Sequence, residues 1–199
     1  MSDAELVERA RRGDRDAFGE LVERHQHAVF RTVLAALRSR EDAEEVTQDA
    51  FISAMQKLEH FRGEASFKTW LLTIAWNRAM DRRRSVGEWL RRFVTRAEDD
   101  ERTWEPAATG PSNEETLIAA QDRREVRRLL RTLPAKYRDP LALSAGGEHT
   151  FEEIAALLRI PVGTAKWRAM EGRRLLKRKL EGRTGGRGVG LETGFKAEG

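Results

Sequence analysis

One stretch near the C-terminus restricts what this chain can fold into more than any other. Its apolar residues recur at the i, i+3, i+4, i+7 spacing of one helix face: Phe151, Ile154, Ala155 and Leu158. Thr150 precedes this run, with Glu153 three residues further on, which is the pattern of a capping box. Pro161 and Gly163 then predict a break, and Thr164 is placed to cap a second helix. We therefore expect two helices joined by a tight turn.

The second of these helices is rich in positive charge. Its basic residues are Lys166, Arg168, Arg173, Arg174, Lys177, Arg178 and Lys179. Two short helices of this kind form the helix-turn-helix unit, whose second helix enters the DNA major groove. Any antiparallel helix pair also needs a turn, and a basic helix is often only a solvated face. The rest of the chain must decide between these two interpretations.

The charges are unevenly distributed along the chain, although the formal net charge is only +4. Residues 166–183 hold eight basic residues and two acids, whereas residues 41–49 hold five acids and no base. This polarity indicates one surface for a polyanion and a separate acidic docking surface. At 199 residues the chain is long enough for one ordinary domain or two small ones.

Several classes of protein are excluded by what the sequence lacks. There is no cysteine, so disulfides, thiolate metal sites and cysteine nucleophiles cannot form. No apolar run reaches the roughly 20 residues of a membrane span. The first residues lack the basic and apolar regions of a signal peptide. We expect a cytoplasmic protein with no membrane insertion.

Nearly all of the patterned sequence has the period of a helix, and no alternating run predicts a strand. Residues 1–84 are typical of a bundle of three or four helices, with Ser39, Asp42 and Ser66 as candidate caps. The apolar stripes of this bundle are Phe18, Leu21, Val22, His25, Val29, Val33 and Leu37; Ala43, Val46, Ala50, Phe51, Ala54 and Leu58; and Phe67, Trp70, Leu71, Ile74 and Ala75.

The predicted fold class is all-α, with two small helical domains joined by a flexible linker. The first domain is expected at residues 1–90 and the second at residues 113–182. Residues 91–112 form the linker, because they combine an acidic run with Pro106, Gly110 and Pro111. A glycine-rich flexible tail follows at residues 183–199.

Enzyme chemistry finds little support in the sequence. The four histidines lack metal-ligand spacing, and His25 falls on an apolar stripe, which favours a core residue over a ligand. The acids of residues 41–49 are expected on a helix surface as solvated carboxylates with ordinary pKa values. No nucleophile-elbow or kinase-type motif is present. We expect no catalytic residue, no metal and no cofactor.

The segment 60–78 places aromatic residues among basic ones, followed by the run Arg82–Arg84. The aromatic residues are Phe61, Phe67, Trp70 and Trp76, and the basic residues are Arg62, Lys68 and Arg78. Aromatic faces can stack unpaired bases while cations follow the phosphates, and the short loop around Gly63 can shape a pocket for an extruded base. The alternative is that Phe67, Trp70 and Ile74 are core residues at helical spacing, which we expect for most of their surface.

Four blocks of this sequence, in this order, resemble the bacterial extracytoplasmic-function sigma factors, the smallest group of the sigma-70 superfamily. They are Asp42-Ala-Glu-Glu-Val-Thr-Gln-Asp-Ala-Phe51, Phe61-Arg-Gly-Glu-Ala-Ser-Phe-Lys-Thr-Trp-Leu71, Ile74-Ala-Trp-Asn77 and the helix-turn-helix segment. The resemblance covers about residues 3–84 and 113–180. It implies a sigma-2-like helical bundle followed by a sigma-4-like helix-turn-helix domain.

The resemblance also implies partners and site residues. Partners would be core RNA polymerase, through the clamp helices of its largest subunit, promoter DNA and an anti-sigma factor. The polymerase-binding residues would be Asp42, Glu45, Gln48, Asp49 and Phe51. Recognition and melting of the promoter −10 element would involve Phe61, Arg62, Ser66, Lys68, Trp70, Asn77, Arg78 and Arg82. The −35 element would be read by Thr164, Lys166, Trp167, Arg168, Met170, Arg173 and Arg174.

The chain departs from the family pattern in the helix-turn-helix segment. Arg159 stands where a glycine is usual at the end of the first helix, and Ala165 and Trp167 replace a valine and a serine. Glu171 occupies a position where a basic residue is frequent. Gly172 is a poor helix former, which costs about 1 kcal/mol relative to alanine. These departures leave open which −35 sequence is read.

Two other classes of protein remain possible from the sequence. A stand-alone helix-turn-helix regulator would bind duplex operator DNA without polymerase, commonly as a dimer, but it would leave the aromatic segment without a role. A sigma-like decoy that only sequesters a partner would not need the basic second helix. A transcription assay with purified core polymerase distinguishes a sigma factor, a stand-alone regulator and a decoy.

Overall fold

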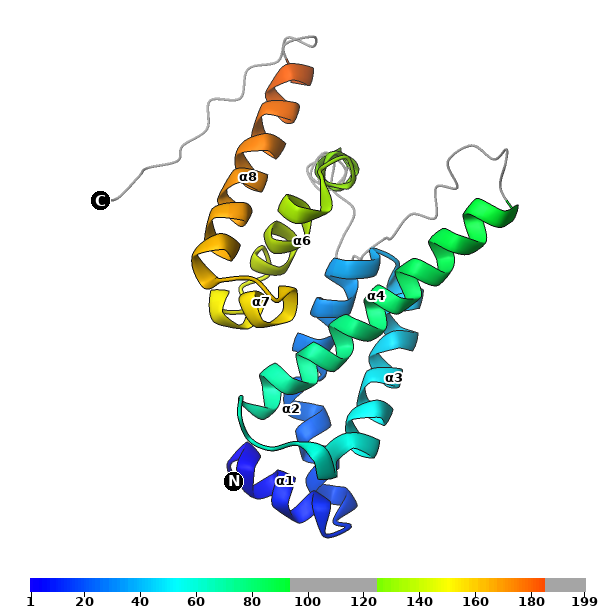
Figure 1. The fold of residues 1–199 in the computed structure, drawn as a ribbon, viewed down its shortest axis with the longest axis vertical. Coiled ribbons are helices and arrows are strands. Elements are labelled where there is room, and N and C mark those ends of the chain that lie inside the picture. The colour runs from blue at the N-terminus through cyan, green and yellow to red at the C-terminus, as the bar shows by residue number, and fades with distance from the viewer. Residues whose placement is uncertain (94–124, 185–199) are drawn as a thin grey trace, which may run out of the picture.

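The computed structural model describes residues 1–93 and 125–184, and all regular elements within these ranges are helices. They form an N-terminal and a C-terminal helical unit that lie against each other (Figure 1). The all-α prediction is therefore confirmed for the described residues. The predicted linker, apart from residues 91–93, and nearly all of the predicted tail lie outside them.

The N-terminal unit contains four α-helices and one short 3-10 helix. They are α1 (Asp3–Arg11), α2 (Arg15–Leu37), α3 (Arg40–Lys57), η1 (Leu58–His60) and α4 (Phe67–Phe93). Ser39 caps α3 by accepting a hydrogen bond from the Asp42 amide, and Ser66 caps α4 by accepting one from the Thr69 amide. The predicted caps at Ser39 and Ser66 are confirmed, whereas Asp42 is not a cap because it lies in the first turn of α3. Helix α4 continues past the predicted end of the bundle at residue 84.

Helix α2 occupies the centre of the N-terminal unit and contacts α1, α3 and α4 (Figure 1). Leu21, Val29 and Val33 on its predicted stripe are completely buried. The stripe of α3 is buried throughout, and Phe67, Leu71 and Ala75 of α4 close the same core. The helical spacing of apolar residues in the sequence therefore identifies the core of this unit correctly.

The C-terminal unit begins with a helical segment at residues 125–131 and continues with α6 (Ala135–Ser144), α7 (Phe151–Leu158) and α8 (Val162–Thr184). The predicted capping box at the start of α7 is present: Glu153 N–H donates to the Thr150 hydroxyl, and Thr150 N–H donates to the Glu153 carboxylate. Helices α7 and α8 thus form the predicted helix-turn-helix pair.

The predicted cap at Thr164 is wrong, because α8 begins at Val162 and Thr164 lies within its first turn. The carbonyl of Pro161 accepts the first hydrogen bond of the helix from the Ala165 amide. The break between the helices is therefore shorter than expected. It is made by Arg159, whose φ of 54° places it in the left-handed region that glycine adopts more readily.

Gly172 lies where α8 crosses α6 at close range. A Cβ atom at this position would lie 2.7 Å from the Tyr137 carbonyl oxygen and 3.3 Å from Leu141 Cβ. The poor helix propensity of Gly172 is therefore offset by a close approach that a larger residue would prevent.

Along residues 1–93 and 125–184, none of the helices combines the length and the apolar character that a membrane crossing requires.

Replacing Gly172 with alanine should destabilise the C-terminal unit, although helix propensity alone predicts the opposite sign. Overpacking costs about 1–3 kcal/mol, which exceeds the gain of about 1 kcal/mol in propensity. The free energy of unfolding can be measured by urea denaturation followed by circular dichroism. Gly19→Ala is the matched control, because a Cβ atom at this helical glycine meets nothing within 4 Å. Equal stabilisation by both substitutions would contradict the packing argument.

Candidate nucleic-acid and partner-binding faces

The outer face of α3 carries both polar and apolar exposed residues. Gln48 and Asp49 are exposed as predicted, whereas Phe51 is buried in the core. Ile52 and Met55 lie on the same outer face and are 56% and 52% exposed. An apolar centre with a polar rim is the usual composition of a protein-binding surface. The positions of Ile52 and Met55, off the buried stripe of α3, are the sequence signal that identifies them as exposed apolar residues.

Asp42 and Glu45, the other two predicted polymerase contacts, are held by Arg82 of α4. The Arg82 Nη2 atom lies 2.9 Å from Asp42 Oδ1 and 2.9 Å from Glu45 Oε2. The pKa of Arg82 is raised, mainly because its side chain donates a hydrogen bond to Asp42. Arg82 was predicted to contact −10 DNA, so the structure joins residues from two predicted sites into one ion-pair network between α3 and α4.

The loop between η1 and α4 is anchored by hydrogen bonds from α1, and most of its residues are exposed to solvent. Arg11 of α1 donates from Nε to the Leu58 carbonyl at 3.1 Å and from Nη2 to the Phe61 carbonyl. Residues 62–66 are all exposed, and Gly63 has a φ of 73° that favours glycine. Arg62 and Ser66 of the predicted −10 site therefore lie on a fixed, accessible loop. The anchoring role of Arg11 was not evident from the sequence.

The aromatic residues of segment 60–78 are mainly structural. Phe61 is half-buried, and its ring centroid lies 5.1 Å from that of Trp70 and 5.9 Å from that of Phe67. Phe67 and Trp76 are buried. Phe67 is thus a core residue and does not offer a face for stacking a base. The expectation that Trp76 offers such a face is wrong, because its ring is buried. Phe61 and Trp70 keep part of their surface accessible.

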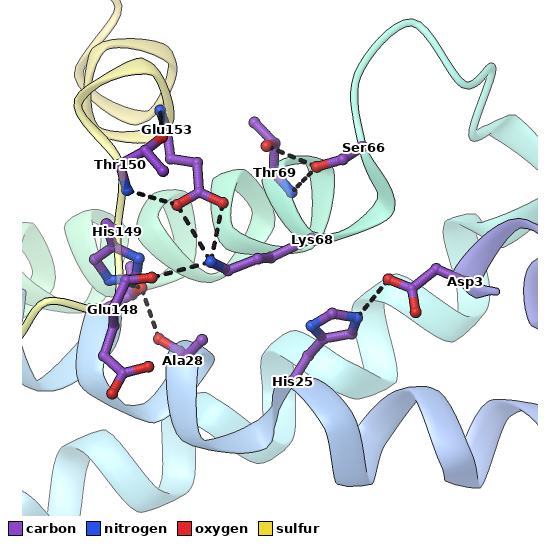
Figure 2. Close-up of polar contacts among 11 residues, drawn as sticks. Asp3, His25, Ala28, Ser66, Lys68, Thr69, Glu148, His149, Thr150 and Glu153 are labelled. Carbon is purple, nitrogen blue, oxygen red and sulfur yellow. Dashed lines mark hydrogen bonds and ion pairs between the residues drawn. The ribbon is translucent and has the colours of Figure 1, made fainter. Parts of the chain in front are cut away.

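Three polar residues of α4 complete the predicted −10 face. Asn77 is exposed, and Arg78 is exposed while its Nη2 atom donates to Ser53 Oγ at 2.6 Å. Lys68 is different, because it contacts the C-terminal unit. Its Nζ atom lies 3.0 Å from Glu153 Oε1 and donates to the Glu148 carbonyl at 2.9 Å (Figure 2).

Helix α8 buries one face and exposes another. Ala165 and Ala169 are buried, whereas Lys166, Trp167, Met170 and Arg173 of the predicted −35 site are exposed. Trp167 and Met170 are 51% and 62% exposed, and the Trp167 ring packs edge-on against Tyr137 with centroids 5.9 Å apart.

The remaining −35 candidates are less accessible or already paired. Thr164 and Arg168 are half-buried, and Arg174 forms an ion pair with Glu171 at 2.6 Å. That pairing lowers the pKa of Glu171 through the Arg174 hydrogen bond. Glu171 thus neutralises one of the basic residues on α8.

Within residues 1–93 and 125–184, no group of three or more acidic or histidine side chains is arranged to hold a metal ion. His25 packs against Phe67, and its Nε2 atom lies 2.7 Å from Asp3 Oδ2 (Figure 2). His25 is therefore a half-buried residue at the edge of the core, in keeping with its place on the apolar stripe.

Comparisons with known proteins agree with this arrangement of two helical units. A family model described as Sigma-70 region 2 matches residues 21–97, and one described as Sigma-70, region 4 matches residues 123–176. The chain is thus a sigma factor of the sigma-70 type, in which region 2 precedes region 4.

Relatives identify the group within that class. The ECF RNA polymerase sigma-E factor of Escherichia coli (strain K12) is 34% identical over 183 residues, covering 91% of this chain and 95% of the relative. The RNA polymerase sigma-H factor of Pseudomonas aeruginosa is 32% identical, covering 90% and 94%. The chain belongs to the extracytoplasmic-function (ECF) family of RNA polymerase sigma factors.

Solved structures agree with the fold. CnrH in complex with the cytosolic domain of CnrY superimposes with a TM-score of 0.64 at 26% identity, covering 90% of this chain and 97% of that one. The sigma factor RpoE in complex with the anti-sigma factor NepR from Bartonella quintana gives a TM-score of 0.64 at 21% identity, covering 82% and 96%.

Replacing Arg82 with alanine should lower the free energy of unfolding by about 0.5–1 kcal/mol, because two carboxylates on α3 lose their shared partner. The loss should shrink at high salt, which screens half-exposed charges. Arg84→Ala is the control, since Arg84 pairs with Asp81 on its own helix and is largely exposed. Equal effects of the two substitutions in urea denaturation would contradict a structural role for Arg82.

Proposed function

We propose that this ECF sigma factor directs core RNA polymerase to promoters, with each helical unit reading one promoter element. The N-terminal domain, residues 1–90, binds polymerase and the −10 element. The helix-turn-helix domain, residues 113–182, reads the −35 element, and residues 91–112 connect them. Because α4 runs to Phe93, the linker is expected to begin with the last turn of that helix.

The observation that carries the proposal is the separation of three exposed faces on a common core. The outer face of α3 presents Gln48, Asp49, Ile52 and Met55, which suits a protein partner. The loop and α4 present Arg62 and Asn77, which suits an unpaired strand. Helix α8 presents Lys166, Trp167, Met170 and Arg173, which suits a duplex groove.

The mechanism follows from differential binding and uses no catalytic side chain. If the loop and α4 hold an unpaired −10 strand more tightly than duplex, binding shifts the melting equilibrium of the promoter toward the open form. The duplex contacts of α8 keep the polymerase in register while the strands separate. The protein acts where polymerase and DNA are found, which is the cytoplasm of a bacterium.

An anti-sigma factor is the further partner that we propose. The support comes from the structures of CnrH, which is in complex with the cytosolic domain of CnrY, and of RpoE, which is in complex with the anti-sigma factor NepR.

Run-off transcription with purified core polymerase on a library of promoter fragments tests the proposal. Promoter-specific transcripts that require this protein are expected. Tight binding to duplex DNA without transcription would favour a stand-alone regulator, and polymerase binding without transcription or DNA binding would favour a decoy. Either result would overturn the proposed function.

Replacing Asn77 with alanine should reduce open-complex formation at least tenfold, because an exposed amide on the −10 face is lost while the core is untouched. Polymerase affinity should not change. Permanganate reactivity of unpaired thymines measures opening, and fluorescence anisotropy measures affinity. Ser85→Ala, an exposed polar position two turns further along α4, is the control. Normal opening by the Asn77 variant on a cognate promoter would remove Asn77 from the site.

Replacing Lys166 and Arg168 with alanine should weaken −35 duplex binding and flatten its salt dependence. Each lost phosphate contact reduces the slope of log K against log salt by about 0.9. The slope can be measured by titrating the duplex at several salt concentrations. Lys179→Ala removes an exposed charge from a more distant turn of α8 and should leave the slope nearly unchanged. An unaltered slope in the double variant would contradict phosphate contact by this pair.

A further inference from the structure

The exposed residues of α8 form one stripe along the helix. Positions three and four apart share a face of a helix, and the exposed residues between positions 163 and 177 follow this spacing. They are Gly163, Lys166, Trp167, Met170, Arg173, Arg174 and Lys177, which we call the outer stripe. The centre of the outer stripe is apolar, because Trp167 and Met170 lie three positions apart on it.

The packing of α8 does not require large apolar side chains at these two positions. Ala165, Ala169 and Gly172 form the buried side of the helix, which lies along α6 (Figure 1). Trp167 and Met170 lie on the other side and are mostly exposed. Single exposed apolar residues are ordinary, but two large neighbours on an otherwise charged helix indicate a surface that a partner covers.

Tyr137 of α6 holds the Trp167 ring in place. The two ring centroids lie 5.9 Å apart at an interplanar angle of 66°, which is the edge-to-face arrangement that aromatic pairs favour. Tyr137 is half-buried, and its backbone lies close to α8, since a Cβ atom at position 172 would come within 2.7 Å of the Tyr137 carbonyl oxygen. The indole is therefore supported on the side of α6, while its remaining surface faces solvent.

Positive charge borders the apolar centre at both ends. Lys166 precedes it and Arg173 follows it along the outer stripe, and both side chains are exposed. Such a border suits duplex DNA, because phosphates can pair with the cations while the groups between them meet the edges of the bases. A neutral apolar partner that covered Trp167 and Met170 would leave these cations without a counter-charge. The charge distribution therefore favours DNA as the occupant.

The centre of the outer stripe has little capacity to read bases through hydrogen bonds. An indole has one N–H donor, and a thioether is only a weak acceptor. The neighbouring guanidinium of Arg174 donates from Nε and Nη2 to the Glu171 carboxylate at 2.8 and 2.6 Å. This pairing occupies the fork of donors that would otherwise bind the edge of a guanine. Recognition at this centre therefore depends on apolar contact.

Thymine is the base that an apolar centre can distinguish. Its C5 methyl group projects into the major groove, and the other three bases present no such group there. We propose that Trp167 and Met170 form a binding site for thymine methyl groups in the −35 duplex. The inference rests on the proposed function, in which α8 reads that element. Trp167 and Met170 contact the methyl group, whereas Tyr137 acts by positioning Trp167.

Base analogues in the −35 element of a cognate promoter separate the methyl group from the rest of thymine. Uracil lacks only the C5 methyl group, and 5-methylcytosine carries the same group on a different base. Core polymerase loaded with this protein is titrated with promoters in which one thymine at a time is replaced by uracil. The affinity should fall about three- to fivefold at a contacted thymine, which corresponds to one buried methyl group. At that position, 5-methylcytosine should bind more tightly than cytosine by a similar factor.

Substitutions assign the effect to individual side chains. Trp167→Ser should bring the ratio of thymine to uracil affinity close to one. Val126→Ser is the matched control, because Val126 is an exposed apolar residue elsewhere in the C-terminal unit, and it should leave the ratio unchanged. Tyr137→Ala should lower the ratio about twofold, whereas Tyr137→Phe keeps the ring and should preserve it. A merely structural role of Tyr137 would change both affinities equally and leave the ratio unchanged.

The results that would overturn the proposal can be told apart from a failure of the proposed function. A ratio of one at every thymine, or a −35 element without thymine, would overturn methyl recognition but leave the −35 role of α8 intact. A ratio that survives Trp167→Ser would exclude Trp167 from the site. Weaker polymerase binding by Trp167→Ser with an unchanged ratio would make the outer stripe a protein-binding surface. If promoter binding does not depend on the −35 sequence at all, the proposed function of α8 fails.

Discussion

The burial of α2 is the constraint on which the rest of the structure depends. Leu21, Val29 and Val33 are completely buried, and α2 contacts α1, α3, α4 and α6. Because α3 and α4 pack their apolar stripes inward, their opposite sides must face outward. The outer face of α3 and the exposed side chains of α4 are therefore held in fixed relative positions by one core. A cavity in α2 would disturb both faces at once.

The helix-turn-helix unit repeats this division on a smaller scale. Ala165, Ala169 and Gly172 bring α8 close to its neighbours, and the resulting orientation turns Trp167 and Met170 outward. Small residues on the inner side thus determine which large residues are exposed on the outer side of α8. Departures of this chain from the family pattern, such as Trp167 and Glu171, fall on or beside that outer side, away from the residues that pack α8 on its neighbours.

The sequence predicts the helices, most of the core and the caps at Ser39, Ser66 and Thr150, because these depend on neighbours a few residues away. It does not predict contacts between distant segments. The bond from Lys68 to Glu153 joins residues 85 positions apart, and Arg82 meets Asp42 across two helices. Gly172 looks unfavourable until the Tyr137 carbonyl is placed beside it. Thr164 failed as a cap because the Pro161 carbonyl begins the helix three residues earlier.

Site-specific photocrosslinking in the polymerase-bound chain tests the assignment of the two DNA faces most directly. A photoreactive side chain placed at position 77, and separately at position 167, would be activated on a cognate promoter, and the attached nucleotides would be mapped. We expect position 77 to attach to the unpaired strand of the −10 element and position 167 to attach to the −35 duplex. Attachment of both positions to one element, or of position 77 only to paired DNA, would contradict it.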